Sequence, residues 1–146
     1  MSLLVLDASV ALKWYLPRAG ETLVGEAFEV LRQYRDHEIQ LITPGFLWAE
    51  FGNVLWKAVR QGRMPEDAAA KAIAEMRGWK IPDIPLIDLV PFALSIAVST
   101  GRTVYDCLYV ALAVQSGGEL VTADERLANA LAARYPVKWL GLFSST

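Results

Sequence analysis

The sequence has few of the side chains that bind transition metals or act as bases at neutral pH. Its 146 residues include one cysteine and one histidine. Cys107 therefore has no partner for an intramolecular disulfide, and a multi-cysteine metal site is excluded. Because Cys107 lies in an apolar helical run, we expect it to be a small buried core group. His37 lies in a polar stretch, which predicts a solvated loop residue rather than a catalytic base.

Long apolar runs are also absent. The longest stretch without a charged residue, 89–101, is shorter than the roughly 20 residues that a membrane-spanning helix needs. Met1 leads almost directly into an apolar run without the basic flank of a signal peptide. We therefore expect a cytoplasmic protein with no membrane partner. At this length, the content of 54% hydrophobic and 21% charged residues predicts one globular domain over 1–146.

The chain has no excess of basic residues. Its 14 Lys and Arg residues face 16 Asp and Glu residues, for a net charge of -2. A protein that binds nucleic acid usually carries a basic excess. If four of the acids are metal ligands, however, the remaining surface becomes slightly positive. The net charge therefore does not exclude a nucleic-acid partner.

Short apolar runs alternate with segments of helical periodicity along the chain. The predicted strands cover 3–6, 40–43, 86–89, 119–122 and 137–140, and the predicted helices cover 8–16, 21–35, 46–62, 65–78, 92–99, 104–114 and 124–134. The helix at 104–114 is apolar on nearly every side, so we expect neighbours on more than one of its faces. The alternating order predicts an α/β fold with a central, mostly parallel sheet and helices on both faces.

Carboxylates stand at comparable places near the ends of predicted strands or the starts of predicted helices. They are Asp7 after the first strand, Glu50 early in a long helix, Asp106 in the first turn of the buried helix, and Asp124 after the fourth strand. Residues beyond the carboxyl ends of parallel strands converge on one crevice. We therefore expect the four acids to share one edge of the sheet.

Three of these acids also have a simpler structural explanation. Asp7 and Asp106 suit the start of a helix, where Asp accepts hydrogen bonds from free amides or faces the positive end of the dipole. Thr122 and Glu125 form the pattern of a capping box, in which case Asp124 merely suits the same dipole.

Glu50 is harder to explain in this way. It lies on the shoulder of the apolar stripe of its helix, so a structural role would require an interior ion pair. Lys57 is too far along the helix for an i,i+4 bond to Glu50. Asn53, one turn from Glu50, is an accessory polar residue placed to orient a ligand.

A cluster of acids needs a counter-charge. At about 4 Å, two carboxylates repel each other by roughly 4 kcal/mol even in a surface-like dielectric, so the cluster must protonate, spread apart or bind cations. Mg²⁺ and Mn²⁺ prefer oxygen ligands and use few carboxylates together with water. The sequence therefore predicts a Mg²⁺ or Mn²⁺ site, with two ions if the chemistry is phosphodiester hydrolysis.

Several segments of the chain resemble the PIN-domain ribonucleases, specifically the VapC-like toxins of toxin–antitoxin pairs. The segments are VLDASV at 5–10, Glu50 within its helix, TVYDCLYVALA at 103–113 and LVTAD at 120–124. The resemblance covers essentially the whole chain. Cys107 replaces a common alanine, and Gln115 stands where an acid is frequent.

The resemblance implies a PIN-like α/β/α sandwich, usually a homodimer, that acts as a metal-dependent endoribonuclease and as the toxin of a pair. The implied catalytic and metal-binding acids are Asp7, Glu50, Asp106 and Asp124, with Ser9 and Thr122 as accessory polar groups. It also implies a cognate antitoxin that inserts a basic side chain into the acidic pocket. The alternative is a catalytically weak PIN-like module that mainly binds a protein partner.

Basic and aromatic residues near the acids are candidates for RNA contacts. The candidate phosphate ligands are Lys13, Arg18, Lys57, Arg60 and Arg102, although solvated surface charge explains each of them equally well. Trp14 and Tyr15 would either stack on bases or belong to the core. Trp48 and Trp56 lie one step off the main stripe of their helix, which indicates a second apolar surface such as a dimer contact.

Overall fold

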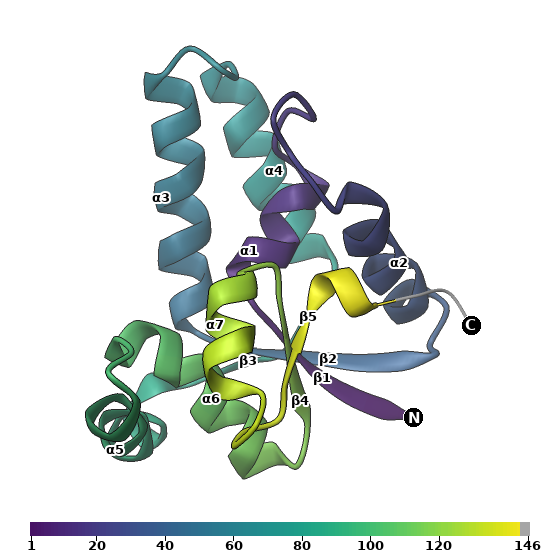
Figure 1. The fold of residues 1–146 in the computed structure, drawn as a ribbon. Helices are drawn as coiled ribbons and strands as arrows, with labels where there is room; N and C mark the ends of the chain where they lie inside the picture. The colour runs from purple at the N-terminus through teal and green to yellow at the C-terminus, as the bar shows by residue number, and fades with distance from the viewer. Residues whose placement is uncertain (144–146) are drawn as a thin grey trace.

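The sheet that positions the site has five strands within residues 1–143, the part of the chain that the computed structural model describes (Figure 1). The strands are β1 (Ser2–Leu6), β2 (Ile39–Pro44), β3 (Asp83–Ile84), β4 (Glu119–Thr122) and β5 (Val137–Trp139). They lie in the order β3-β2-β1-β4-β5, and every neighbouring pair is parallel. The predicted α/β class with a central parallel sheet is therefore confirmed.

Strand β1 occupies the centre of this sheet. Val5 is in register with Ile42 of β2 and with Leu120 of β4. The strand is paired on both edges, and Val5 and Leu6 have no exposed surface. This explains why the first strand is a continuous apolar run rather than an alternating one. It also places the residue after Leu6 between the ends of two neighbouring strands.

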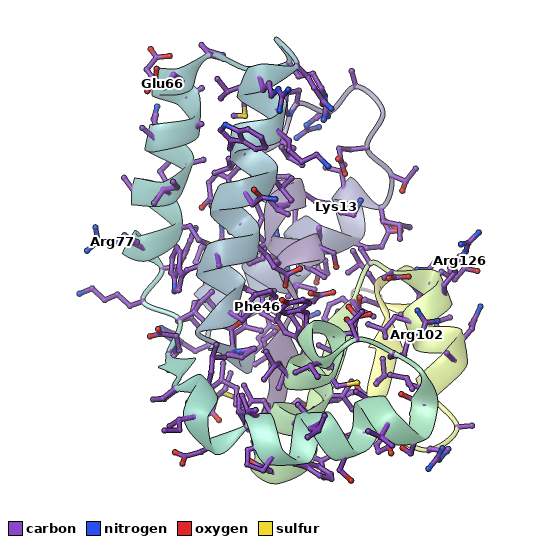
Figure 2. The ribbon with its side chains drawn as sticks, turned by 90° about the vertical axis from the view of Figure 1, so that its left-hand side faces the viewer. Lys13, Phe46, Glu66, Arg77, Arg102 and Arg126 are labelled. Carbon is purple, nitrogen blue, oxygen red and sulfur yellow. The ribbon has the colours of Figure 1, made fainter. Side chains whose placement is uncertain are left out.

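Helices flank the sheet as an α/β/α sandwich requires. They are α1 (Ala8–Ala11), α2 (Val24–Arg35), α3 (Phe46–Arg60), α4 (Glu66–Gly78), α5 (Val90–Thr100), α6 (Val104–Ser116) and α7 (Glu125–Leu131), with 3-10 turns η1 (Leu12–Trp14), η2 (Leu86–Asp88) and η3 (Leu140–Leu142). Helices α3 and α4 rise together from the sheet (Figure 1), and Glu66 and Arg77 mark the length of α4 in Figure 2. Within residues 1–143, none of these helices combines the length and apolar character needed to cross a membrane.

Helix α6 forms much of the core. It packs against β1, β2 and β4 on one side and against α5 on another. Every side chain from 107 to 113 is buried, and Cys107 has no exposed surface. The expectations of a helix with neighbours on more than one face and of a core cysteine are both confirmed.

The predicted strand at 86–89 is wrong. This segment forms the 3-10 turn η2, and the strand lies earlier, where Asp83 and Ile84 pair with Thr43 and Pro44. Pro85 separates the two, since it has no amide hydrogen to continue a ladder. The turn buries Leu89 but leaves Ile87 79% exposed, so the apolar run does not mark a buried strand.

Several predicted helices have different boundaries. The helix expected at 8–16 is one α-helical turn followed by a 3-10 turn that ends at Trp14. The helix expected from residue 21 begins at Val24, because Leu23 adopts a left-handed conformation with φ of 55°. Trp14 is buried, and its indole nitrogen donates a hydrogen bond to the Ala27 carbonyl at 2.7 Å. It belongs to the core and is not available for base stacking.

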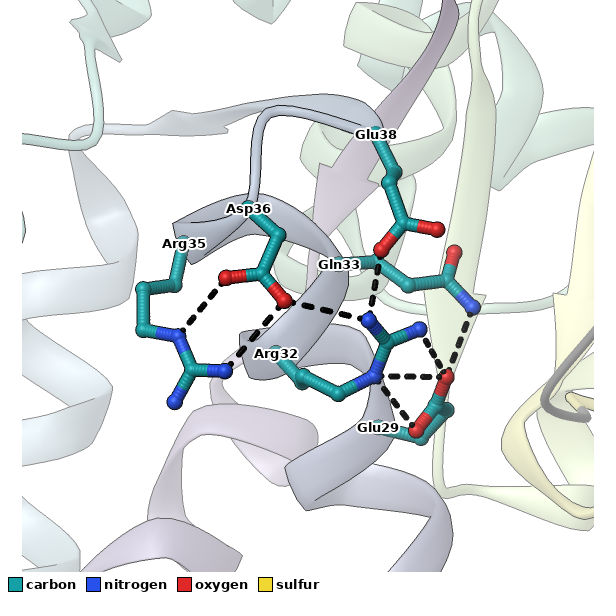
Figure 3. A network of polar contacts seen from close by, with 6 residues as sticks. All are labelled: Glu29, Arg32, Gln33, Arg35, Asp36 and Glu38. Atoms are coloured by element: carbon teal, nitrogen blue, oxygen red, sulfur yellow. Dashed lines mark hydrogen bonds and ion pairs between the residues drawn. The ribbon is translucent and has the colours of Figure 1, made fainter.

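An ion-pair network surrounds the turn between α2 and β2, at the end of the sheet opposite the carboxyl edge (Figure 3). Arg32 donates hydrogen bonds to Glu29, Asp36 and Glu38. The network therefore joins the last turns of α2 to Glu38, the residue before β2. His37 lies in this turn, exposed and with φ of 60°, as expected of a loop residue.

A buried hydroxyl joins the two central strands next to the site. The Thr43 side chain is 1% exposed and donates to the Leu6 carbonyl at 2.9 Å. We expect Thr43→Val, which keeps the shape and removes the donor, to lower the free energy of unfolding in urea by about 1 kcal/mol. Thr100→Val, which removes a half-buried hydroxyl on α5, should cost less. If both variants lowered the free energy of unfolding equally, the Thr43 hydroxyl would not be a special link between β1 and β2.

Candidate active site

Asp7 lies directly after β1, at the carboxyl edge of the sheet. Its side chain is 8% exposed, and it occupies the N-cap position of α1 without making a side-chain cap bond. Its Oδ2 instead accepts hydrogen bonds from the hydroxyls of Ser9, at 2.7 Å, and Thr122, at 2.6 Å. The capping explanation is therefore wrong for Asp7. The carboxylate is turned toward the end of the neighbouring strand β4.

The two hydroxyls are themselves fixed by backbone amides. Ser9 Oγ accepts a bond from the Ala123 amide, and Thr122 Oγ1 accepts one from the Asp124 amide, each at 3.0 Å. Each hydroxyl oxygen thus accepts a hydrogen bond from a backbone amide and donates its own hydrogen to the Asp7 carboxylate. The turn after β1 and the turn after β4 thus hold one carboxylate in a defined orientation.

Asp124 is exposed and is the true N-cap of α7. Its Oδ1 accepts a hydrogen bond from the Leu127 amide at 3.1 Å. The predicted capping box of Thr122 and Glu125 is wrong, because the Thr122 side chain is fully buried and donates to Asp7. A cap explains part of the role of Asp124.

Glu50 lies in the second turn of α3 and is half-buried. Its Oε1 accepts a short hydrogen bond from the hydroxyl of Tyr109, a residue of α6 that is 3% exposed. The interior ion pair considered from the sequence is therefore not the explanation. Lys57 and Asn53 are both exposed, and within residues 1–143 no hydrogen bond joins Asn53 to Glu50. The role of Asn53 in orienting a ligand stays a prediction.

Asp106 lies in the first turn of α6 and is half-buried. The Thr103 hydroxyl caps the helix by accepting a bond from the Asp106 amide at 3.2 Å. The Asp106 carboxylate is therefore not used as the cap. Arg102 lies close enough for its charge to act on Asp106, while its guanidinium donates to the Arg126 carbonyl at 3.0 Å. These two arginines are labelled on the same side of the molecule in Figure 2.

The charges of the acids act on one another in pairs. Burial raises the pKa of Asp7, and the Asp106 charge raises it further against the opposing hydrogen bonds from Thr122 and Ser9. Burial is also the main cause that raises the pKa of Glu50 to about 7, with repulsion from Asp7 and Asp106 adding to it. The pKa of Asp106 is raised by burial and by the charge of Asp124. Each of the four acids thus lies within the electrostatic reach of another.

The donor set fits a divalent ion of the Mg²⁺ type in its chemistry. Within residues 1–143, no three Asp, Glu, His or Cys side chains are close enough to hold a metal ion together. A complete cage is not needed, because Mg²⁺ is usually held by one or two carboxylates with water and substrate phosphate as the other ligands. Burial is the main cause that raises the pKa of Asp7, Glu50 and Asp106, and repulsion between the acids adds to it, so a cation among them would be favoured.

Tyr109 is the site residue that the sequence reasoning missed. It was part of an apolar helical run, and its ring is indeed buried, but its hydroxyl reaches across from α6 to α3. The sequence does indicate this role in one way: Tyr109 follows Asp106 by three residues, so both side chains lie on one face of the helix.

The cations proposed for RNA contacts have varied environments. Lys13 forms an ion pair with Glu21 at 2.9 Å. The Arg18 guanidinium stacks over Phe28, and that of Arg60 over Trp56. These contacts do not test whether the residues bind RNA phosphates, so that role stays a prediction.

The chain has a parallel sheet with carboxylates at its carboxyl edge, and it matches one family of α/β domains. Residues 4–131 match the family model of the PIN domain. The chain therefore belongs to the PIN-domain family, and the resemblance identified in the sequence is confirmed.

Individual relatives extend the match. Ribonuclease VapC3 from Pyrobaculum aerophilum is 33% identical over 134 residues, which cover 86% of this chain and 92% of that protein. Exonuclease VapC9 from the same organism is 39% identical over 79 residues, 53% of this chain and 57% of that protein. A toxin–antitoxin complex from Klebsiella pneumoniae contains a chain with a TM-score of 0.61 and 15% identity, covering 94% of this chain and 96% of that chain. At that identity the structural match shows the fold alone.

The Tyr109–Glu50 hydrogen bond should support metal binding. Tyr109→Phe keeps the buried ring and removes the donor that orients Glu50. We expect the Mn²⁺ dissociation constant, measured by calorimetry, to rise about tenfold, the lower end of the effect of groups that orient metal ligands. Tyr34→Phe is the matched control, because its hydroxyl bonds the Trp79 carbonyl away from the acids. Unchanged Mn²⁺ affinity in Tyr109→Phe would refute this role.

The stability of the metal-free protein should fall as the pH rises. Glu50 has an ordinary pKa of 4.5 and a folded-state pKa of about 7, so the folded chain binds more protons than the unfolded chain between these values. Stability conferred by this group is complete below the lower value and is lost through the upper one. In EDTA, we expect the melting temperature to decline across about pH 5 to 8. Glu50→Gln should decline less steeply, and identical slopes would show that Glu50 does not titrate in this range.

Proposed function

We propose that this protein is a divalent-metal-dependent endoribonuclease that hydrolyses RNA phosphodiester bonds. The observation that carries the proposal is the buried Asp7 carboxylate, fixed by two hydroxyls and repelled by Asp106, with no cation paired to it among residues 1–143. The 33% identity to Ribonuclease VapC3 over most of both chains supports RNA as the substrate.

The roles of the residues follow from their positions. Asp7, Glu50 and Asp106 would hold Mg²⁺ or Mn²⁺, and the exposed Asp124, whose charge acts on Asp106, would serve a second ion or orient water at the rim. Divalent ions supply an activated water and offset the charge that develops on the phosphate oxygens. Ser9 and Thr122 fix the plane of the Asp7 carboxylate through Oδ2. Tyr109 holds Glu50 in position through Oε1.

The test uses circular single-stranded RNA, because a circle has no end from which an exonuclease can start. We expect the purified protein to linearise it with Mg²⁺ or Mn²⁺ and not with excess EDTA. Asp7→Asn should reduce cleavage to the EDTA level, since it removes a ligand charge and keeps the shape. Asp88→Asn, which changes an exposed acid in η2, is the matched control and should cleave normally.

The outcomes separate the candidate functions. Cleavage of linear RNA alone would indicate exonuclease activity, as the name of the relative VapC9 suggests for that protein. Mn²⁺ binding in calorimetry without cleavage of either RNA would favour the catalytically weak module that binds a protein partner. Equal cleavage by Asp7→Asn and the unmodified chain would refute the assignment of the site.

We also propose that the protein is a toxin controlled by an antitoxin and that it forms a homodimer. The shared fold with a chain of a toxin–antitoxin complex supports the first role. The uncompensated acids would accept a basic side chain of the antitoxin. Exposed apolar side chains along η2 and α5 support the homodimer: Ile87, Val90, Leu94 and Val98. Analytical ultracentrifugation of the chain, alone and co-expressed with the product of an adjacent small reading frame, would measure both assemblies.

A further inference from the structure

Two aromatic rings stack beside the acids and are used by none of the roles above. The rings of Phe46 and Tyr105 lie 5.0 Å apart between centroids, with an angle of 13° between their planes. Phe46 begins α3, one helical turn before Glu50, and Tyr105 directly precedes Asp106 on α6. The pair therefore joins the two helices that carry these acids. Figure 2 labels Phe46 near the centre of the view that shows this side of the molecule.

Tyr105 is unusual among the tyrosines of the site region. Tyr109, one turn later on α6, is 3% exposed and uses its hydroxyl, whereas Tyr105 is 61% exposed. A nearly parallel stack covers one face of the Tyr105 ring with Phe46 and directs the other face away from it. Phe46 is half-buried and packs against the core, so the exposed ring has a rigid backing.

We propose that Tyr105, backed by Phe46, is a stacking platform for one unpaired RNA base next to the scissile phosphate. The inference rests on the proposed ribonuclease function and names a substrate contact for it. A flat aromatic face binds any of the four bases, because every base has a π-face. It binds only a base whose own faces are free, so the platform selects single-stranded or flipped-out nucleotides over duplex RNA.

The surroundings of the ring favour a nucleotide over an apolar protein partner. Asp106 directly follows Tyr105, and the exposed Thr103 is the N-cap of the same helix. Arg102, held by the Arg126 carbonyl, supplies a cation near Asp106 for an adjoining phosphate. The exposed apolar stripe of this protein instead follows α5, at Val90, Leu94 and Val98. Tyr105 thus lies directly next to Asp106 and outside the apolar stripe of α5.

Binding and cleavage assays on variants test the platform. We expect Tyr105→Leu to weaken binding of a short fluorescein-labelled single-stranded RNA about tenfold in anisotropy titrations, the scale of one lost base stack. The titrations use the Asp7→Asn background so that the RNA stays intact, and cleavage rates are compared in the otherwise unmodified chain. Tyr105→Phe keeps the ring and should bind normally. Tyr135→Leu removes a half-buried aromatic ring that precedes β5, at the edge of the sheet opposite the acids, and should leave RNA affinity unchanged.

A second measurement distinguishes stacking from a general surface effect. A set of RNAs is prepared in which a single abasic residue stands at successive positions. We expect the protein that keeps Tyr105 to bind one of these RNAs about tenfold more weakly than the intact RNA. Tyr105→Leu should bind that same RNA no worse than the intact RNA, because the partner of the base is already gone. With Asp7 intact, the unmodified chain and Tyr105→Leu should bind Mn²⁺ with equal affinity, which would show that the metal ligands are undisturbed.

Each outcome decides one of the two proposals. If the unmodified chain cleaves RNA and Tyr105→Leu binds and cleaves equally well, the platform is refuted and the ribonuclease function stands. If RNA binds through Tyr105 but is not cleaved, the platform stands and the catalytic function fails. If Tyr105→Leu instead changes the sedimenting mass and leaves RNA affinity unchanged, the ring is a protein contact. Absence of any RNA binding overturns both proposals.

Discussion

One buried carboxylate organises this protein: Asp7, held between the hydroxyls of Ser9 and Thr122. The interaction exists because β1 and β4 are parallel neighbours, so their carboxyl ends meet and the two following turns face each other. A charged group at this depth is tolerated only with hydrogen bonds and counter-charge. The hydroxyls of Ser9 and Thr122 provide the hydrogen bonds, and a bound ligand would provide the counter-charge. The chemistry proposed for the protein follows from this division.

The other groups of the site reach this carboxylate from helices rather than strands. Glu50 comes from α3 and Asp106 from α6, and the Tyr109 hydroxyl and the Phe46–Tyr105 stack each connect these two helices. The cost of placing like charges together is visible in the raised pKa of Glu50, about 7. Stability sacrificed at a working site is common in proteins, because binding of the ligand recovers it.

Much of this arrangement was accessible from the sequence, and the exceptions have physical causes. Apolar runs and helical periodicity predicted the central strands and long helices, and the strand-end rule predicted that Asp7 and Asp124 share an edge. Local rules failed where tertiary contacts compete with them. The Thr122 hydroxyl serves Asp7 instead of a capping box, and Pro85 turns an apolar run into η2. The Tyr109 hydroxyl was missed because an apolar pattern does not show where a single polar atom points.

The Asp7–Thr122 bond joins residues 115 positions apart in the chain. During translation, the amino-terminal strand leaves the ribosome long before its partner β4 has been synthesised. The edge of β1 that pairs with β4 therefore stays unpaired, and the carboxylate centre closes only after residue 122 has emerged. Until then, the nascent chain carries no assembled centre beside the RNA of the ribosome that is making it.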